Sequence, residues 1–561
     1  MPETSALLNA RYVAKILKAH HCRHVVIAPG SRNAPLILAF TADADYECIS
    51  VPDERVAAFT AMGMTIGLKA PVAVICSSGS AAVNFYPAVT EAFYQRLPLL
   101  LITADRPKEF IDQGMGQTIR QENIFEQHIC FSANLLRDPA DELSRHYNQR
   151  LLNQAMMELH QGPVHVNVPF NEPLYETVAD MPEQEEVHLI QKLKPELLLD
   201  EDYLTGLGEL WNNAPKIMIL AGQMDSNPWL EEAIQELNER SPFLVLSETV
   251  SNLSLPNAIS TIDRLINTIS EEEKAGLAPD LLITIGGEIV SKMVKKFLKD
   301  HVPKHHWHVD EAGELRDSFQ CLQTVIPVQA DNFFEQLFEF TDKRESSYSD
   351  HWLGINREKQ NTHTAFIESA VFSDLTAFGQ ILEQMPEDGI LHCANSAAIR
   401  YAQLFDHPTG REHYANRGTS GIDGCTATAI GHALTTNKQL TLITGDVAFL
   451  YDSNAFWNNR LPDNIKIIIL NNQGGNIFRI IPGPEGQKSL ETYQETVHNL
   501  NARGVADTFK IEYQSAHGKE ELRKILPGFF NKRERAILEI FTPRLESPEV
   551  LKDYFKAIKG A

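Results

Sequence analysis

The amino-acid sequence predicts an α/β protein with three doubly wound domains of mainly parallel sheet. Short, continuous apolar runs recur along the chain, which is typical of strands buried on both faces of a parallel sheet. Each run ends in glycine or small polar residues and is followed by a helical pattern, as in a repeated strand–turn–helix unit. Two polar stretches, residues 171 to about 200 and TDKRESSYSDHWLGINREKQ (341–360), interrupt this alternation. We therefore expect domains over residues 1–180, 190–340 and 365–561.

The first domain begins with an apolar pattern, MPETSALLNARYVAKIL, that predicts an amphipathic helix with Thr4 or Ser5 as its N-cap. A stretch rich in Glu and Pro, from residue 171 to about 200, predicts a linker to the second domain. Between them we expect four strands, namely His24–Ala28, Val72–Cys76, Leu99–Thr103 and Val164–Val168.

The same pattern predicts the strands of the other two domains. In the second domain they are Lys216–Ala221, Phe243–Leu246, Leu281–Ile285 and Trp307–Val309. In the third they are Ile390–Cys393, Leu440–Thr444, Ile465–Leu470 and Ala536–Ile540. Ligands of open parallel sheets bind beyond the carboxyl ends of the strands, so the turns after these strands hold the candidate site residues.

Charge and cysteine content exclude several classes of protein. The net charge of −24 over 561 residues argues against a nucleic-acid or membrane-surface binder. No apolar run reaches the roughly 18 residues that a membrane span requires, and the N-terminus lacks the pattern of a secretory signal peptide. Seven cysteines without a CxxC pair favour free thiols in a reducing compartment. We expect a cytoplasmic protein without nucleic-acid or membrane partners.

Common nucleotide motifs are absent. There is neither a GxGxxG that opens a helix after a strand nor a GxxxxGK[ST] sequence. The run His305-His306-Trp307-His308 places two histidines on one face of a strand, but we identify no carboxylate or cysteine placed to complete a metal site with them. We therefore expect no metal at this run.

A stronger signal follows two strands of the third domain. Asp446 comes after Leu440–Thr444 and Gly445, and Asn472 comes shortly after Ile465–Leu470. Carboxylate, amide and backbone carbonyl oxygens are the ligands that Mg²⁺ accepts, usually together with phosphate oxygens. The pair therefore predicts a seat for a metal-bound diphosphate, although polar turns after two ordinary strands would have the same sequence.

Glu54 is a candidate for a second part of the site. It opens a helix in the sequence Asp53-Glu54-Arg55, where an acid can also simply stabilise the helix dipole. Three α/β domains with an early glutamate and a late GD…NN motif resemble the thiamin-diphosphate enzymes. The resemblance implies that the first domain binds the aminopyrimidine of thiamin diphosphate and the third binds its diphosphate with Mg²⁺ or Mn²⁺.

Longer segments sharpen this resemblance. They match, in order along essentially the whole chain, the 2-succinyl-5-enolpyruvyl-6-hydroxy-3-cyclohexene-1-carboxylate (SEPHCHC) synthases of menaquinone biosynthesis: APGSRNAPL (28–36), DERVAAF (53–59), SSGSAAVNFYPAVTEA (77–92), LITADRP (101–107), GQTIRQ (116–121), NRGTSGIDG (416–424) and GDVAFLYDSNAF (445–456). The resemblance implies a decarboxylating transfer from 2-oxoglutarate to isochorismate. It also implies a homodimer or homotetramer with active sites between subunits.

The resemblance assigns a role to individual residues. Asp446, Asn472 and Gly474 would bind the metal, and the cofactor would also contact Glu54, Ser396, Gly421 and Ile422. Isochorismate would face Ser31, Arg32, Arg106 and Gln117. The dicarboxylate 2-oxoglutarate would be surrounded by Lys292, Ser396, Arg400 and Arg417. Catalytic roles would fall to Glu54, Arg32, Arg106, Gln117, Arg400 and Arg417.

The cations in this set agree with the implied substrates, because dicarboxylates are held best by charge-assisted and bidentate pairs. For a single arginine, a solvated surface charge would be the simpler interpretation. Two other functions remain open at this point. One is a different thiamin-diphosphate enzyme of 2-oxo acids, such as an acetolactate synthase or a decarboxylase. The other is a non-catalytic diphosphate-binding protein.

Overall fold

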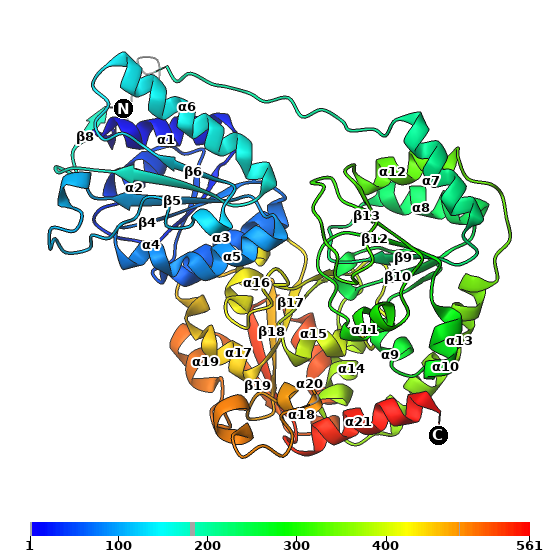
Figure 1. Cartoon of the computed structure of the whole chain (residues 1–561). Helices are drawn as coiled ribbons and strands as arrows, with labels where there is room; N and C mark the ends of the chain where they lie inside the picture. The colour runs from blue at the N-terminus through cyan, green and yellow to red at the C-terminus, as the bar shows by residue number, and fades with distance from the viewer. Residues whose placement is uncertain (1–2, 180–185, 482, 561) are drawn as a thin grey trace.

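A computed structural model describes residues 3–179, 186–481 and 483–560. The chain forms three separate six-stranded parallel sheets, each flanked by helices (Figure 1). This confirms the predicted three-domain α/β fold. The N-terminal and middle domains lie side by side above the C-terminal domain, and an extended segment, residues 186–200, leads from the first to the second (Figure 1).

The N-terminal sheet has the strand order β3-β2-β4-β5-β7-β6. Its strands are β2 (His24–Ile27), β3 (Glu47–Ser50), β4 (Val72–Cys76), β5 (Leu99–Asp105), β6 (Phe131–Asn134) and β7 (Val164–Pro169). Every residue of β4 and β5 is buried, as the apolar runs predict. The helices are α1 (Leu8–Ala19), α2 (Ala34–Ala42), α3 (Glu54–Leu68), α4 (Ser80–Asn84), α5 (Tyr86–Gln95) and α6 (Glu142–Glu158).

The N-terminus differs from the prediction. Glu3–Ser5 forms strand β1, which pairs antiparallel with β8 (Thr177–Ala179), and helix α1 begins only at Leu8 with Leu7 as its N-cap. Thr4 and Ser5 therefore do not cap the helix. The partner strand lies inside the expected linker, more than a hundred residues away, so local periodicity could not reveal the pairing. The expected domain boundary at residue 180 lies outside the described residues.

The middle sheet has the order β11-β10-β9-β12-β13-β14. Its strands are β9 (Ile217–Ala221), β10 (Leu244–Ser247), β11 (Ala258–Ile259), β12 (Leu281–Ile285), β13 (His305–Val309) and β14 (Thr324–Ile326). The helices are α7 (Glu201–Asn213), α8 (Pro228–Arg240), α9 (Ile262–Ile266), α10 (Glu271–Leu277), α11 (Lys292–Asp300) and α12 (Ala330–Phe338). The polar stretch before the third domain, residues 341–360, is largely helical, because α13 (Tyr348–Ser369) begins within it and covers its later part.

The C-terminal sheet has the order β16-β15-β17-β18-β20-β19. Its strands are β15 (Ile390–Cys393), β16 (Glu412–Tyr414), β17 (Leu440–Gly445), β18 (Ile465–Asn471), β19 (Glu512–Ala516) and β20 (Ala536–Phe541). The helices are α14 (Asp374–Gln384), α15 (Ala397–Ala402), α16 (Cys425–Ala433), α17 (Asp446–Tyr451), α18 (Ile477–Ile480), α19 (Arg503–Phe509), α20 (Lys519–Asn531) and α21 (Glu546–Lys559).

Helices α3 and α16 join the N-terminal and C-terminal domains. They cross at two glycines, and a Cβ atom on either glycine would lie 2.0 Å from a carbonyl oxygen of the facing helix. Gly63 faces the carbonyl of Thr428, and Gly431 faces that of Thr60. The close approach buries the apolar sides of both helices in one core cluster that the two domains share.

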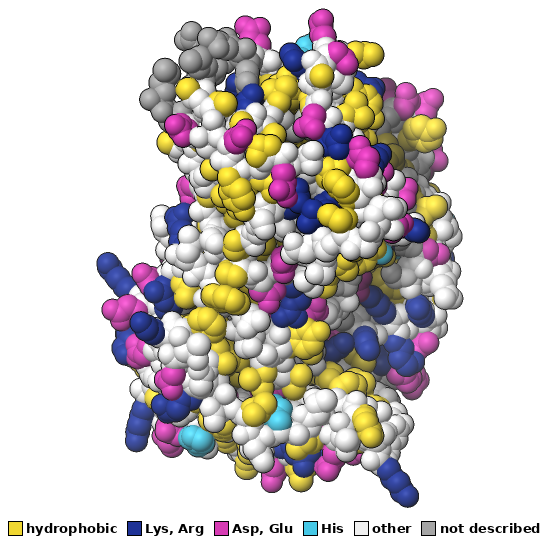
Figure 2. All heavy atoms as spheres, turned by 90° about the vertical axis from the view of Figure 1, so that its left-hand side faces the viewer, with side chains coloured by type: hydrophobic (Ala, Val, Ile, Leu, Met, Phe, Trp, Pro, Cys, Tyr) yellow, Lys and Arg dark blue, Asp and Glu magenta, His cyan; other side chains and the backbone are white. Residues whose placement is uncertain are grey.

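Charged side chains of both signs are mixed on the surface (Figure 2). On the face shown in Figure 2, acidic and basic side chains are interspersed and form no continuous basic surface. Within the described ranges, no helix combines the length and the hydrophobicity that a membrane span needs.

Candidate active site

The three predicted metal ligands lie together at the carboxyl edge of the C-terminal sheet. Asp446 is the first residue of α17, directly after β17, and Asn472 follows the neighbouring strand β18. The backbone N–H of Gly474 donates to Asp446 Oδ2 at 2.9 Å. Asp446 and Asn472 are only 3% and 6% exposed. The parallel pairing of two strands thus brings residues 26 positions apart in the sequence to one point.

The orientation of the Asn472 amide fits a bound cation. Its Nδ2 donates to Asp374 Oδ2 at 2.9 Å, so Oδ1 is turned the other way. Among the described residues, this buried oxygen has no hydrogen-bond partner. A buried acceptor without a donor is costly unless something binds it. Together with the Asp446 carboxylate, it gives the all-oxygen donor set that suits Mg²⁺ or Mn²⁺.

The predicted cofactor residues surround the same edge. Ile422 packs on Ala394, which directly follows β15, and on Cys425 and Ala448, which lie in α16 and α17. Asn395, at the end of β15, donates to the carbonyl of Gly421 at 2.6 Å. The next residue, Ser396, has a φ of 75° and caps α15, a strained conformation of the kind found at functional sites.

Arg400 and Arg417 supply the positive charge at this edge. Arg417 is 7% exposed and donates to Asn395 Oδ1 at 2.9 Å. In the described part of the chain, neither Arg417 Nε nor Arg400 Nε has a partner, although both are buried. Burial lowers the pKa of Arg417, and the nearby Arg400 guanidinium lowers it further. A buried and a half-buried guanidinium that lie near each other, each with a buried Nε donor without a partner in the described residues, favour an anionic ligand.

The middle domain reaches this cluster through Ser291. Lys292, the first residue of α11, is exposed, and Ser291 caps the helix. The N–H of Ser291 donates to Glu248 Oε1 at 2.8 Å, and its hydroxyl donates to Asp263. Glu248 also contacts the side-chain amide of Gln403, which follows α15. Burial raises the pKa of Glu248 to about 8.

A second cluster lies at the carboxyl edge of the N-terminal sheet. Ser31, Arg32, Arg106 and Gln117 line one cavity of about 470 Å³, together with residues 172–176. Arg32 is 5% exposed and donates to the carbonyl of Phe170 at 3.1 Å. Burial and the neighbouring Arg106 both lower the pKa of Arg32. This cavity therefore brings together the four residues expected to face isochorismate.

Glu54 lies at the same sheet edge but apart from the metal ligands. It is the first residue of α3, after the N-cap Asp53, whose carboxylate accepts the N–H of Val56 at 3.2 Å. The Glu54 carboxylate accepts a hydrogen bond from the side-chain amide of Asn84 at 3.4 Å. The guanidinium of Arg55, the residue after Glu54, donates to the carbonyl of Tyr451 at 3.0 Å. Tyr451 is the last residue of α17, and Asp446 is the first.

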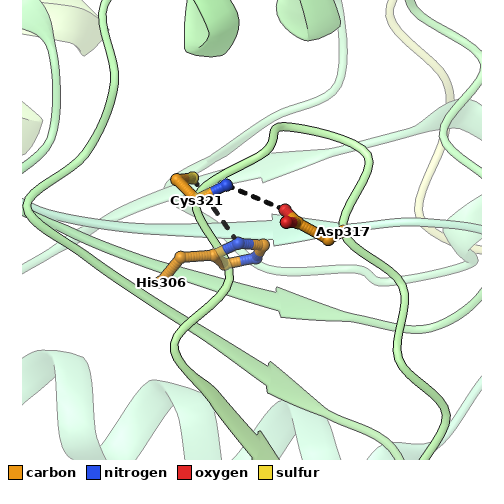
Figure 3. A group of neighbouring side chains, drawn as sticks. All are labelled: His306, Asp317 and Cys321. Carbon is orange, nitrogen blue, oxygen red and sulfur yellow. Dashed lines mark hydrogen bonds between the residues drawn. The ribbon is translucent and has the colours of Figure 1, made fainter.

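The histidine run differs from its prediction. His306 Nδ1 lies 3.7 Å from Cys321 Sγ, and Asp317 accepts the N–H of Cys321 at 2.8 Å (Figure 3). The expectation that no carboxylate or cysteine is placed to complete a metal site at this run is wrong, because the loop between β13 and β14 folds back over the strand and brings Asp317 and Cys321 to His306. His306 also contacts Thr284, so these mutual hydrogen bonds account for the cluster without a bound ion.

Several residues that support the site were not among the predicted site residues. Asp374 orients Asn472 from α14, and Glu172 lies 3.5 Å from Arg32 within the expected linker. Glu91 and Glu248 contact the C-terminal domain from the other two domains. Each was an ordinary acid in a helix or loop of the sequence. Only the apolar helix around Glu91 hinted at burial.

Comparison with known proteins agrees with this geometry. Residues 9–124, 208–393 and 395–540 match the N-terminal, middle and C-terminal domain families of thiamine pyrophosphate enzymes. Proteins named 2-succinyl-5-enolpyruvyl-6-hydroxy-3-cyclohexene-1-carboxylate synthase match over nearly the full length. The protein of Christiangramia forsetii is 41% identical over 98% of this chain and 99% of its own. Those of Flavobacterium johnsoniae and Porphyromonas gingivalis are 40% and 39% identical, covering 98% and 96% of this chain and 98% and 95% of their own. The chain therefore belongs to the SEPHCHC synthase family of thiamin-diphosphate enzymes.

Proposed function

We propose that this protein is a thiamin-diphosphate-dependent transferase of cytoplasmic menaquinone biosynthesis. It would decarboxylate 2-oxoglutarate and join the remaining four-carbon unit to isochorismate, giving SEPHCHC and CO₂. The observation that carries this proposal is the gathering of four arginines, two buried and two half-buried, into two clusters. Arg32 and Arg106 share one cavity, and Arg400 and Arg417 share the edge that holds the metal ligands. Two dicarboxylate substrates require two such clusters.

The residues of the C-terminal edge fit the cofactor. Asp446, Asn472 Oδ1 and the carbonyl of Gly474 would hold Mg²⁺ or Mn²⁺ against the diphosphate. Ile422 would support the rings of the cofactor from its apolar base. Glu54 would donate a hydrogen bond from its carboxyl group to the ring nitrogen N1′ of the aminopyrimidine and share that proton with it. When bound, thiamin diphosphate supplies the carbon nucleophile and the electron sink for the loss of CO₂.

The arginines of the two clusters would make the main contacts to the carboxylates of the substrates. The Nε groups of Arg106, Arg400 and Arg417 are buried without a partner in the described residues, so a carboxylate that reaches them gains hydrogen bonds without displacing a protein partner. Arg400 and Arg417 would orient 2-oxoglutarate, assisted by Ser396 and Lys292. Arg32 and Arg106 would hold isochorismate, with Ser31 and Gln117 fixing its position. Such orientation and charge stabilisation are typically the largest protein contributions to catalysis.

We also propose that the complete site forms between subunits of a homodimer or homotetramer. Arg55, next to Glu54, contacts Tyr451 at the far end of α17 from Asp446. Because α17 has six residues, its ends lie roughly 8 Å apart at the usual rise per residue. Glu54 and Asp446 of one chain thus approach opposite ends of this helix. The exposed Tyr451 and Trp457 side chains beside this contact suit a subunit interface.

A coupled assay tests the proposed activity. Purified protein is mixed with thiamin diphosphate, Mg²⁺, 2-oxoglutarate and isochorismate, and both CO₂ release and isochorismate consumption are followed. We expect both to depend on all four additions. Turnover of pyruvate in preference to 2-oxoglutarate would favour an acetolactate synthase or decarboxylase instead. Cofactor binding without CO₂ release would favour a non-catalytic protein.

A further inference from the structure

Glu91 is a buried acid that contacts none of the proposed ligands. It lies on α5 of the N-terminal domain and is 2% exposed. Its carboxylate accepts the backbone N–H groups of Gly418 and Thr419 at 2.6 and 2.7 Å, and the Thr419 hydroxyl at 2.6 Å. Both carboxylate oxygens are therefore used on a loop of the C-terminal domain. Such charge-assisted hydrogen bonds are stronger than neutral ones.

The loop that Glu91 holds is residues 416–424, which we name the glycine loop. It carries Arg417 directly before the first contact and Ile422 a few residues after it. Asn395 closes the same loop from its own domain by donating to the carbonyls of residues 416 and 421 at 2.6 Å each. The two ends of the loop are thus fixed by Asn395, and its middle is fixed by Glu91.

The fit between α5 and the glycine loop is close. A Cβ atom on Gly418 would lie 2.4 Å from the carbonyl oxygen of Glu91, so the backbone approaches the helix as only glycine permits. Gln95, one helical turn further on, contacts both Glu91 and Gln223. Gln223 in turn donates to the carbonyl of Ala415, just before the loop, at 3.2 Å. All three domains therefore meet at this loop.

We propose that Glu91 is a positioning residue that sets the glycine loop, and with it Arg417 and Ile422, for the cofactor and 2-oxoglutarate. The inference rests on the proposed function for the roles of Arg417 and Ile422. Removal of the carboxylate would leave two buried N–H groups without acceptors, and the loop would move to find new ones. The cavity of Arg32 and Arg106 lies elsewhere and would stay intact.

The test compares Glu91→Ala and Glu91→Gln in the full-length holoenzyme. We expect the KM for 2-oxoglutarate and the Kd for thiamin diphosphate to rise about 10- to 100-fold in Glu91→Ala, the range for a lost charged hydrogen-bond group. Glu91→Gln keeps one acceptor and should lie between Glu91→Ala and the wild type. The KM for isochorismate should not change in either variant.

Thr90→Ala is the matched control, because the Thr90 hydroxyl bonds only the Pro87 carbonyl, which is its one recorded partner in the described residues. It should keep all constants near wild type. Equal rises in both KM values, or no rise in the Kd for thiamin diphosphate, would overturn the proposal. Hydrogen exchange of residues 416–424 and cofactor affinity need no turnover. Faster exchange and weaker binding in the Glu91 variants would therefore support the positioning role even if the proposed reaction fails.

Discussion

The N-terminal and C-terminal sheets share one topology but differ in what their carboxyl edges hold. Counted along the chain within each domain, both sheets have the strand order 2-1-3-4-6-5. After the second strand, one domain begins a helix at Glu54 with Asp53 as its N-cap, and the other begins a helix at Cys425 with Gly424 as its N-cap. After the third strand, one places Gly79 before a short helix and the other places Asp446. The turn residues, and not the topology, therefore decide the chemistry of each edge.

The two sheets are also packed as near equivalents. The helix after the second strand is α3 in one domain and α16 in the other, and these two helices face each other. In each helix, a threonine carbonyl three residues before the glycine contacts the glycine of the other. The middle sheet has a different order and lies outside this pairing. We therefore treat the outer domains as two versions of one unit with divided roles.

The largest expected effects on activity come from Glu54 at the edge of the N-terminal sheet and from Asp446 at the edge of the C-terminal sheet. Glu54→Gln should lower kcat about 10²- to 10⁴-fold, as for lost acid–base assistance, with little change in cofactor affinity. Asp446→Asn should instead weaken metal-dependent binding of thiamin diphosphate by more than roughly 100-fold. Steady-state kinetics and calorimetry separate the two results. The exposed Glu126→Gln is the control, and near-normal kcat in Glu54→Gln would remove Glu54 from the chemistry.

The next effect concerns the two arginine clusters. Arg106→Met should raise the KM for isochorismate about 10- to 100-fold and leave that for 2-oxoglutarate unchanged, because a charged hydrogen-bond group is lost in one cavity only. Arg417→Met should show the reverse pattern. Arg150→Met, on the N-terminal domain away from both clusters, serves as the control. Parallel changes in both KM values would show that the two edges do not divide the substrates.

A smaller effect tests the packing of the two units. Gly63→Ala should lower the free energy of unfolding by about 1–3 kcal/mol, because the added methyl group meets the Thr428 carbonyl. Chemical denaturation measures the change. Gly504→Ala in α19 is the matched control, since the described atoms leave open space at that position. Equal stability of Gly63→Ala and wild type would contradict the close crossing of α3 and α16.

The smallest effect on turnover is expected at the middle domain. The pKa of Glu248, raised by burial to about 8, exceeds its unfolded value, so the stability it contributes is lost as pH rises towards 8. Asp263, Arg417 and Lys295 are the charged groups that act on it. Glu248→Gln should keep near-normal turnover at pH 7 and flatten the decline in stability between pH 5 and 8. Identical dependence of stability on pH in the wild type and in Glu248→Gln would show that Glu248 is ionised in the folded protein.

The interior of each sheet could be predicted from the sequence, but its edges could not. The twelve predicted strands are the four inner strands of each of the three six-stranded sheets. Inner strands are buried on both faces, which gives a continuous apolar run. The outer strands were missed because they are short or polar, as in the sequences FSAN and EHY. Strand β1 was missed because its pairing with β8 depends on residues far away in the sequence.

The candidate site divides in a similar way. Residues directly after inner strands, such as Arg106 and Asp446, were predictable because parallel strands bring their carboxyl ends to one edge. Glu91, Asp374 and Glu248 were not predicted, because each acts from another helix or domain. Glu91 lies in the segment 77–92 that carries the resemblance, but the resemblance assigned it no role. Lys292 was predicted from the resemblance. The structure places it at the start of α11, next to the residue that Glu248 holds.

A complementation experiment tests most directly whether the two edges complete one site between chains. Glu54→Gln and Asp446→Asn proteins are co-expressed with different tags, and the mixed dimers are purified through both tags. If each site takes Glu54 from one chain and Asp446 from its partner, one of the two sites in a mixed dimer is intact, and about half of the wild-type activity should return. If both residues of a site come from one chain, every site is damaged, and the mixed dimers would be as inactive as the parent variants.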